Sequence, residues 1–104
     1  MQQESAIFRA LGDPSRLAIF ESLASGEAPV KDLTARFRIS QPAVSQHLAA
    51  LRRAGLVTVR HDGRMSFYGL NSAGLKPLVD WLAHYQAFWS GRISRLSALL
   101  KEMD

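Results

Sequence analysis

Hydrophobic residues recur at helical spacing through the first half of the chain. Between these stretches stand residues that begin or end helices. Asp13 and Ser40 can each accept a hydrogen bond from the first turn of a following helix, and Pro14 is tolerated in such a turn. Gly55 follows two arginines, as is favoured at a helix C-terminus. The pattern predicts four helices, at about residues 3–11, 14–24, 29–37 and 41–54.

The pattern then changes to alternation in two short segments, VTVRH and RMSFYGL. Between them stand Asp62 and Gly63, a pair that favours a two-residue turn with positive φ. Because period two puts alternate residues on one face, one face of the strands should pack on the helices. A turn at these two residues makes a β-hairpin of about residues 57–70, which pairs His61 with Arg64, Val59 with Ser66 and Val57 with Tyr68.

A last, long helix is predicted at about residues 73–103, because Asn71 and Ser72 can cap it and apolar residues recur along it. Gly91 interrupts this helix and is a candidate for a bend. The apolar stripe is wider than a lone surface helix in a small domain needs, which indicates a partner helix. Its members are Leu75, Leu82, Trp89, Leu96 and Met103 at seven-residue spacing, with Val79, Ile93 and Leu100 between them.

The length of 104 residues fits a single domain over residues 1–104, and we find no internal repeat, linker or low-complexity segment. So small a core is marginal alone, so burial of further surface in an oligomer would stabilise it. The lack of cysteine excludes disulfides, thiolate metal sites and thiol switches. The polar start lacks a signal sequence and no apolar run could span a membrane, so we expect a cytoplasmic protein.

Basic residues are concentrated in the middle of the chain. Between Lys31 and Arg64, seven basic residues stand against Asp32 and Asp62, a net charge of +5. The rest of the chain has six basic and seven acidic residues. A basic segment between near-neutral ends favours contact with a polyanion such as nucleic acid, although a solvated surface also accounts for the charge.

The predicted elements occur in an order that matches a DNA-binding arrangement. A short helix, a tight turn and a second helix, at about residues 30–54, form a helix-turn-helix, whose second helix enters the major groove. The hairpin at about residues 57–70 follows directly, in the place of a wing. We therefore predict a mainly α fold with a β-hairpin (α+β), a winged helix-turn-helix.

Helical angles divide the helix at 41–54 into two faces. At about 100° per residue, Val44, Leu48 and Leu51 form an inner stripe. Glutamine can pair with adenine, arginine with guanine and alanine with the thymine methyl group, so the opposite face has residue types that read bases. An ordinary solvated face is the alternative. The opposite face holds Pro42, Ser45, Gln46, Ala49 and Arg53.

The predicted tip of the wing carries Arg60, His61 and Arg64. Arginines there suit phosphate contacts or a narrow minor groove. For His61, a DNA contact and simple exposure are both open. His47 lies about 60° from the inner stripe of the preceding helix, and we interpret it as a partly buried structural histidine, with a phosphate contact as the alternative.

Three segments, DPSRLAIFESL, SQPAVSQHLAALRRAGLV and VRHDGRMSFYGL, resemble the ArsR family of bacterial winged-helix repressors. The resemblance covers nearly the whole chain, and its most specific part is residues 40–57. It implies that the helix at 41–54 reads DNA, that the wing adds contacts, and that the helices at about 3–11 and 73–103 form a homodimer. It also implies repression at a double-stranded DNA operator with two-fold symmetry, relieved by an inducer.

The residues and the resemblance together give two sets of candidates. The DNA-binding set comprises Ser40, Gln41, Pro42, Ser45, Gln46, Ala49, Arg53, Arg60, His61 and Arg64. The dimer-interface set comprises Ile7, Phe8, Leu75, Leu78, Val79, Leu82, Tyr85, Trp89, Ile93 and Leu96.

Many ArsR-type proteins sense metals through one of two kinds of site. A cysteine site lies at the start of the third helix, but here residues 28–31 put proline and lysine in the ligand positions. A site of Asp, His and Glu on the last helix is incomplete, since Asp80 and His84 share a face but no second histidine follows. We expect no metal and no other cofactor; a metal-responsive repressor with an atypical Asp80/His84 site is the alternative.

Functions of other classes are less well supported. The chain has no nucleophile–base–acid constellation and no glycine-rich phosphate loop, so we do not expect an enzyme. A winged-helix protein-interaction module is an alternative against which the basic middle argues. If an effector exists, we favour an uncharged or weakly polar organic ligand near the first and last helices. The sequence leaves the operator, the regulated genes, the inducer and the choice between repression and activation open.

Overall fold

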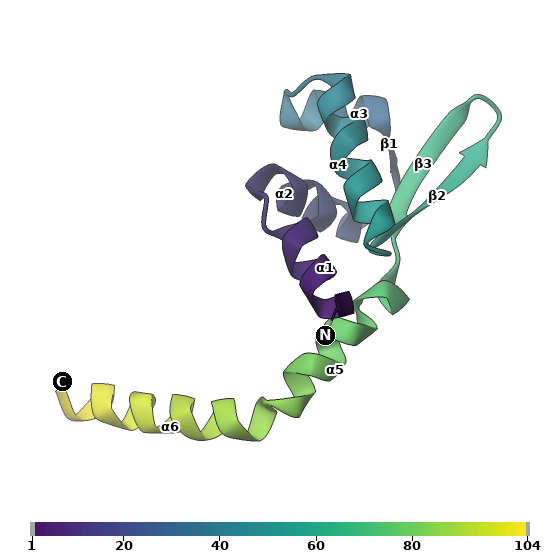
Figure 1. Ribbon diagram of the computed structural model, residues 1–104. Coiled ribbons are helices and arrows are strands. Elements are labelled where there is room, and N and C mark those ends of the chain that lie inside the picture. Colours follow the sequence, from purple (N-terminus) through teal and green to yellow (C-terminus); the bar gives the residue numbers. More distant parts are fainter. Residues whose placement is uncertain (1, 104) are drawn as a thin grey trace.

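Helices make up most of the chain, and a small sheet lies beside them (Figure 1). The computed structural model describes the backbone of residues 2–103 and the side chains of residues 3–86, 91, 92 and 94–102. Two short 3₁₀ helices, η1 (Leu23–Ser25) and η2 (Ser72–Leu75), follow α2 and precede α5. The other elements in chain order are α1 (Gln2–Leu11), α2 (Pro14–Ser22), β1 (Ala28–Pro29), α3 (Val30–Phe37), α4 (Gln41–Arg53), β2 (Val57–Asp62), β3 (Met65–Leu70), α5 (Lys76–His84) and α6 (Gln86–Met103).

Two helices begin at the capping residues that the sequence predicts. The Asp13 carboxylate accepts a hydrogen bond of 2.9 Å from the backbone N–H of Arg16 at the start of α2. The Ser40 hydroxyl accepts one of 3.2 Å from the backbone N–H of Ala43 at the start of α4. These bonds satisfy donors that a helix leaves free in its first turn, so both helices begin where local chemistry favours it.

The core lies between the first four helices and the base of the sheet. Val44, Leu48 and Leu51, the predicted inner stripe of α4, are 0% exposed, so this prediction is confirmed. Ile7 of α1 is also buried, at 1% exposed, because it packs in the core of its own chain. Its assignment to a dimer interface is therefore wrong. The other fully buried large side chains are Ile19, Leu33 and Leu56.

The sheet has three strands in the order β1-β3-β2, all antiparallel. The two-residue strand β1 was not predicted. It pairs Ala28 with Tyr68 and Pro29 with Phe67. Two residues are too few to show an alternating pattern, and proline is unusual in a strand except at an edge, where β1 lies. This strand joins the start of α3 to the wing, residues 57–70, so the hairpin is fixed to the helix-turn-helix at the middle of β3.

The hairpin pairs in a register that differs by two residues from the predicted one. Asp62 pairs with Met65, so the turn residues are Gly63 and Arg64. Gly63 has a φ of +63° and Arg64 does not have a positive φ, an arrangement that fits a type II′ turn, with glycine first. A shift of two residues leaves every side chain on its predicted face. The remaining pairs include His61 with Ser66, Val59 with Tyr68 and Val57 with Leu70.

The last helix is interrupted, but not at Gly91 as predicted. The break lies at Tyr85, between α5 and α6, where φ is −102° and ψ is 3°. The Tyr85 N–H donates to the carbonyl of Leu82, three residues back, at 3.1 Å. Such a tightened last turn ends an α-helix. From there α6 runs away from the body of the domain, and the longest dimension of the chain is 59 Å (Figure 1).

None of the helices within residues 2–103 is long and apolar enough to cross a membrane. The pair α3–α4 is followed directly by the β2–β3 hairpin, and α1, α2 and α5 support the two units. This is the winged helix-turn-helix arrangement, mainly α with a small antiparallel sheet. The predicted fold class is confirmed.

Candidate nucleic-acid interface

The turn between α3 and α4 sets the direction of the helix that could enter a groove. Arg38, which ends α3, has φ 56° and ψ 37°, a left-handed conformation that is rare for a residue with a side chain. Its N–H donates to the carbonyl of Thr34 at 2.9 Å, which closes the last turn of α3. The chain can then reverse within two residues, and α4 begins after the Ser40 cap.

The outer face of α4 points away from the buried inner stripe. Gln46 and Ser45 offer amide and hydroxyl groups near the middle of the helix, and Ala49 places only a methyl group on the next turn of the same face. Ser40 is exposed as well, but its hydroxyl is engaged in capping the helix. A helix with a buried apolar side and a short polar outer side can approach a groove closely. The predicted residues of this helix, Gln41, Pro42, Ser45, Gln46, Ala49 and Arg53, are all exposed.

His47 lies beside the outer face and is half-buried, in agreement with its interpretation as a partly buried histidine. It lies near the Asp13 carboxylate at the start of α2. The pKa of Asp13 is lowered chiefly by the hydrogen bond from the Arg16 backbone N–H, and further by the charges of His47 and Arg16. His47 is therefore less exposed than Ser45, Gln46 and Ala49 of the outer face of α4.

Arg60 of the wing is engaged within the protein. Its Nε donates to Glu27 Oε2 at 3.3 Å, and its Nη2 pairs with Glu27 Oε1. Its guanidinium also stacks over the ring of Phe67, 4.8 Å from the centroid, and Phe67 is its cross-strand partner. The hydrogen bond from Arg60 lowers the pKa of Glu27, and the same bond raises the pKa of Arg60. The structure thus assigns Arg60 to anchoring the wing, a role that sequence reasoning missed.

Gly69 allows the contact between Glu27 and Arg60 across the sheet. Glu27 directly precedes β1, Arg60 lies on β2, and β3 runs between them. Gly69 of β3 has no side chain, and a Cβ built on it would already be 3.5 Å from the Cβ of Glu27. The Glu27 side chain therefore crosses β3 at a residue that leaves room for it. No local pattern could have revealed this pair, because its members are 33 residues apart.

The remaining candidates of the wing lie towards its tip. His61 and Ser66 face each other across the strands, with 2.9 Å between His61 Nδ1 and Ser66 Oγ. Arg64 is an exposed turn residue. Asp62 lies 3.8 Å from the Arg60 guanidinium. The tip therefore presents one unengaged arginine, Arg64, and a histidine that is already hydrogen-bonded.

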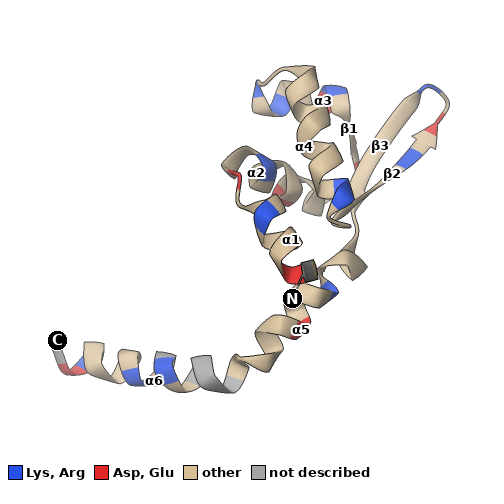
Figure 2. Cartoon of the chain, in the orientation of Figure 1, with Lys and Arg blue, Asp and Glu red and all other residues tan. Residues whose placement is uncertain are grey.

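Basic residues lie along the side of the domain that carries α3, α4 and the wing (Figure 2). Figure 2 shows them on α3, at the hairpin turn and near the end of α4, with acidic residues few between them. Further basic residues lie on α1 and α2, close to the end of α4. The basic residues of the middle of the chain therefore lie on α3, α4 and the wing, the elements that would contact a polyanion.

Exposed apolar side chains lie on α1, on α5 and at Tyr85, and we call them the apolar face of α1 and α5. We define it by four side chains that are exposed by the following fractions: Phe8 48%, Val79 58%, Leu82 49% and Tyr85 39%. Phe8 packs edge-on against Trp81 with ring centroids 5.5 Å apart, and Trp81 contacts Tyr85 at 5.1 Å. Large apolar side chains that are exposed favour a protein interface.

The other predicted interface residues divide into three groups. Leu75 and Leu78 are half-buried and pack against the core of their own chain. Leu96 of α6 is 56% exposed, and two neighbours outside the predicted interface set, Leu99 and Leu100, are also exposed, at 56% and 54%. The side chains of Trp89 and Ile93 lie outside the described residues.

Asp80 and His84, the possible metal ligands on α5, contact other side chains of the protein. The Lys76 Nζ donates to Asp80 Oδ2 at 2.8 Å, one turn apart, and this hydrogen bond raises the pKa of Lys76. The His84 ring packs edge-on against Tyr85 at 4.9 Å. Among the residues that the structure describes, no three His, Cys, Asp or Glu side chains are grouped so that they could hold a metal ion.

Known proteins of similar sequence and structure are transcriptional regulators. Residues 13–59 match the family described as "Bacterial regulatory protein, arsR family". The chain is 30% identical to the transcriptional repressor SdpR of Bacillus subtilis over 79 residues, 76% of this chain and 88% of the relative. It is 38% identical to the transcriptional activator HlyU of Vibrio cholerae over 86 residues, 79% of this chain and 80% of the relative.

The fold is shared as well. A solved ArsR-like transcriptional regulator from Rhodococcus sp. RHA1 superposes with a TM-score of 0.76 at 28% sequence identity, over 94% of this chain and 92% of that one. This chain is therefore a member of the arsR family of bacterial regulatory proteins, a DNA-binding transcriptional regulator and not an enzyme.

Proposed function

We propose that this chain acts as a homodimer that represses transcription by binding a two-fold symmetric operator, with α4 of each copy in a major groove. The observation that carries the proposal is the division of α4 into two faces. Its inner stripe is fully buried, whereas its outer face is exposed, polar and free of large apolar side chains. The basic wing lies beside the same helix. A helix and wing so arranged suit a groove and its flanking phosphates.

Within this proposal, base reading is assigned to Gln46, with Ser45 and Ala49 beside it. A glutamine amide can form two hydrogen bonds to adenine, and alanine can contact the thymine methyl group. Arg64, at the exposed hairpin turn, contacts phosphate or the minor groove. Arg60 supports the wing from within instead of contacting DNA directly, since Glu27 and Phe67 already engage its guanidinium.

The apolar face on α1 and α5 is the proposed dimer contact, with Phe8, Val79, Leu82 and Tyr85 meeting the same face of a second copy. An isologous contact uses the same patch on both copies, so it produces two-fold symmetry. Two reading helices related by such an axis bind half-sites about one helical turn apart, or 10–10.5 bp. The proposed symmetry of the operator follows from the symmetry of the dimer.

Repression is supported by the family resemblance and by the relative that is named a repressor. The relative named an activator shows that the same fold serves both outcomes. We further propose that the signal that releases the operator is not a metal. Asp80 is paired with Lys76, and no cysteine is present. We also propose that the protein acts in the cytoplasm, where a bacterial regulator meets its operator.

An organic effector could occupy a hollow near the first and last helices. The hollow has a volume of about 310 Å³ and lies between α1, the end of α4 and the η2–α5 junction. Ligand binding there would bear on both the proposed dimer helices and the end of the proposed reading helix. Its lining residues are Gln3, Ala6, Ile7, Arg53, Ala54, Ala73, Gly74 and Pro77.

Selection of bound DNA from a random pool, followed by footprinting of the enriched sequence, tests the proposal. We expect an enriched palindrome with two protected half-sites about 10–10.5 bp apart. In transcription with purified polymerase, a site overlapping a promoter should lower transcript yield as the protein is added. A single asymmetric half-site would contradict the dimer, and increased transcription would contradict repression. Failure to enrich any sequence would contradict specific DNA reading.

A further inference from the structure

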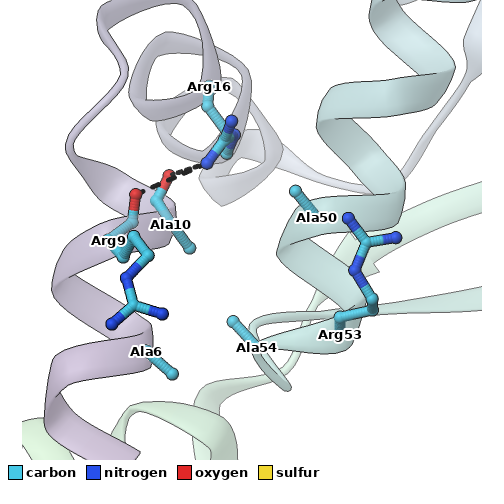
Figure 3. A pocket seen from close by; sticks show the side chains of 7 residues that line it. All are labelled: Ala6, Arg9, Ala10, Arg16, Ala50, Arg53 and Ala54. Carbon is cyan, nitrogen blue, oxygen red and sulfur yellow. Dashed lines mark hydrogen bonds between the residues drawn. The ribbon is translucent and has the colours of Figure 1, made fainter.

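A second hollow, of about 300 Å³, lies between α1, the start of α2 and the last turns of α4 (Figure 3). This volume is at the lower end of the range of about 300–1,000 Å³ that is common for small-molecule sites. Small side chains leave the space open, since four alanines line it: Ala6, Ala10, Ala50 and Ala54. The other lining residues are all arginines: Arg9, Arg16 and Arg53. We call this the arginine hollow.

In the part of the chain that the structure describes, the arginines of the hollow are not paired directly with carboxylates, although the charge of Arg16 acts on the Asp13 carboxylate at the start of α2. No acidic residue lines it, and within residues 2–103 none of its three arginines forms an ion pair. Elsewhere Arg60 and Lys76 each find a carboxylate partner. The closest acidic side chain in sequence, Asp13, has its carboxylate engaged by the α2 backbone. Like charges around a shared space repel one another, and an anion between them relieves that repulsion.

Arg16 is held in place in this hollow, as Figure 3 shows. Its Nη1 donates to the carbonyls of Arg9 at 3.4 Å and of Ala10 at 3.2 Å, at the end of α1. Its Nε is buried and has no hydrogen-bond partner. An anchored guanidinium has little rotamer freedom left to lose when a ligand binds. Arg9 and Arg53, by contrast, are exposed on the two facing helices.

We propose that the arginine hollow binds one oxyanion group of the phosphate class, contacted by Arg9 and Arg53 against the positive charge of Arg16. The planar guanidinium fork matches the oxygens of phosphate, and such charge-assisted hydrogen bonds are strong. The sequence-based assignment of Arg53 to guanine reading is replaced by this role. Arg53 lies at the last residue of α4, where it lines the space next to α1.

The oxyanion has two possible sources, which share this chemistry. One is a small anion in solution, such as inorganic phosphate or a phosphorylated metabolite. The other is a backbone phosphate of the DNA that α4 would bind, because the hollow lies at the end of the same helix. The second source rests on the proposed function, whereas the first needs no DNA. Experiments with and without DNA therefore separate them.

The first experiment uses the full chain without DNA. Thermal unfolding is followed while inorganic phosphate replaces chloride at constant ionic strength and pH. We expect a saturable rise in Tm for the wild type, with no such rise for Arg9→Gln or Arg53→Gln. Arg52→Gln is the matched control, since Arg52 is the exposed neighbour of Arg53 and does not line the hollow. Arg16 is left unchanged because it also closes the end of α1.

The second experiment measures binding to a non-specific DNA duplex over a range of salt concentrations. Loss of one phosphate contact reduces the slope of log K against log salt by about 0.9. We expect this reduction for Arg9→Gln if a DNA phosphate fills the hollow, with Arg52→Gln as the control. The site is supported if phosphate raises Tm only when both Arg9 and Arg53 are present. It is also supported if Arg9→Gln reduces the slope of log K against log salt more than Arg52→Gln does. If Arg9→Gln and Arg53→Gln match Arg52→Gln in both experiments, the proposal is wrong, whether or not an operator is found.

Discussion

Gly74 packs directly against the backbone carbonyl of Gly55. A Cβ built on Gly74 would lie 1.7 Å from the Gly55 oxygen, far inside any real contact. The Asn71 Nδ2 donates to that same oxygen at 2.9 Å, and the Asn71 N–H donates to the carbonyl of Leu56 at 2.9 Å. Gly55 and Leu56, which follow the end of α4, are therefore packed against and hydrogen-bonded to the segment that begins η2.

This contact predicts that Gly74→Ala is destabilising. The added methyl group must push the Gly55 carbonyl away, and overpacking of this kind costs about 1–3 kcal/mol. Urea unfolding followed by circular dichroism measures the loss. Gly91→Ala is the matched control, because a Cβ at Gly91 meets nothing within 4 Å and alanine favours a helix. Equal free energies of unfolding for the two variants would show that Gly74 does not pack tightly against the Gly55 carbonyl.

A second prediction concerns the pair that anchors the wing. The pKa of Glu27 is lowered from its ordinary value of 4.5, chiefly by the hydrogen bond from Arg60. The contribution of this pair to stability is therefore present above pH 4.5 and is lost as the pH falls through the folded-state pKa. Glu27→Gln should be slightly less stable than the wild type at pH 7 and no less stable at acidic pH.

Urea unfolding of both proteins at the two pH values measures this difference. Glu21→Gln serves as the control, since it makes the same change on the exposed surface of α2. The pair is exposed, so the effect should be small and should shrink in high salt. A deficit of Glu27→Gln that persists unchanged at low pH would mean that the carboxylate charge is not what holds Arg60.

The proposed dimer predicts that Leu82→Asp dissociates the protein. A charge placed in an apolar contact has no partner, and leaving it buried costs several kcal/mol. Sedimentation equilibrium should show monomers for this variant and dimers for the wild type. Ser25→Asp adds the same charge on the exposed η1 turn and should remain dimeric. An intact dimer of Leu82→Asp would move the interface away from the apolar face of α1 and α5.

Operator binding should be insensitive to metals and oxidants. The chain has no cysteine to oxidise or to bind arsenic or cadmium, and Asp80 is paired with Lys76. Fluorescence anisotropy of the DNA complex should stay constant in micromolar zinc, in arsenite and in peroxide. Reversible release by zinc that disappears in His84→Ala would restore a metal-sensing role for α5.

The helices and their caps could be predicted because their causes are local. Asp13 and Ser40 lie directly before the turns that they cap, and the inner stripe of α4 repeats at helical spacing. The turn of the wing was misplaced by one residue, which shifts the pairing by two, because Gly63 supplies a positive φ both as the second residue of Asp62-Gly63 and as the first of Gly63-Arg64. Both versions put the same side chains on the same face.

Features that depend on distant residues could not be predicted. Glu27 and Arg60 meet only because β1 joins the sheet beside β3, and the two arginines Arg9 and Arg53 share a hollow only through the packing of α1 on α4. Ile7 has the spacing of an interface residue, but the small core needs it. The break at Tyr85 has no proline or glycine to mark it, so no local signal distinguishes α5 from α6.

In the proposed complex, the outer face of α4 reads the operator through Gln46. The most direct measurement is the ratio of affinities for the selected operator and for a scrambled duplex, taken at one salt concentration. Loss of a bidentate base contact costs about 1–3 kcal/mol of discrimination, so Gln46→Ala should lower the ratio about 5- to 150-fold. Affinity for the scrambled duplex should stay the same, and Gln86→Ala, on α6, should keep the full ratio. An unchanged ratio in Gln46→Ala would contradict the claim.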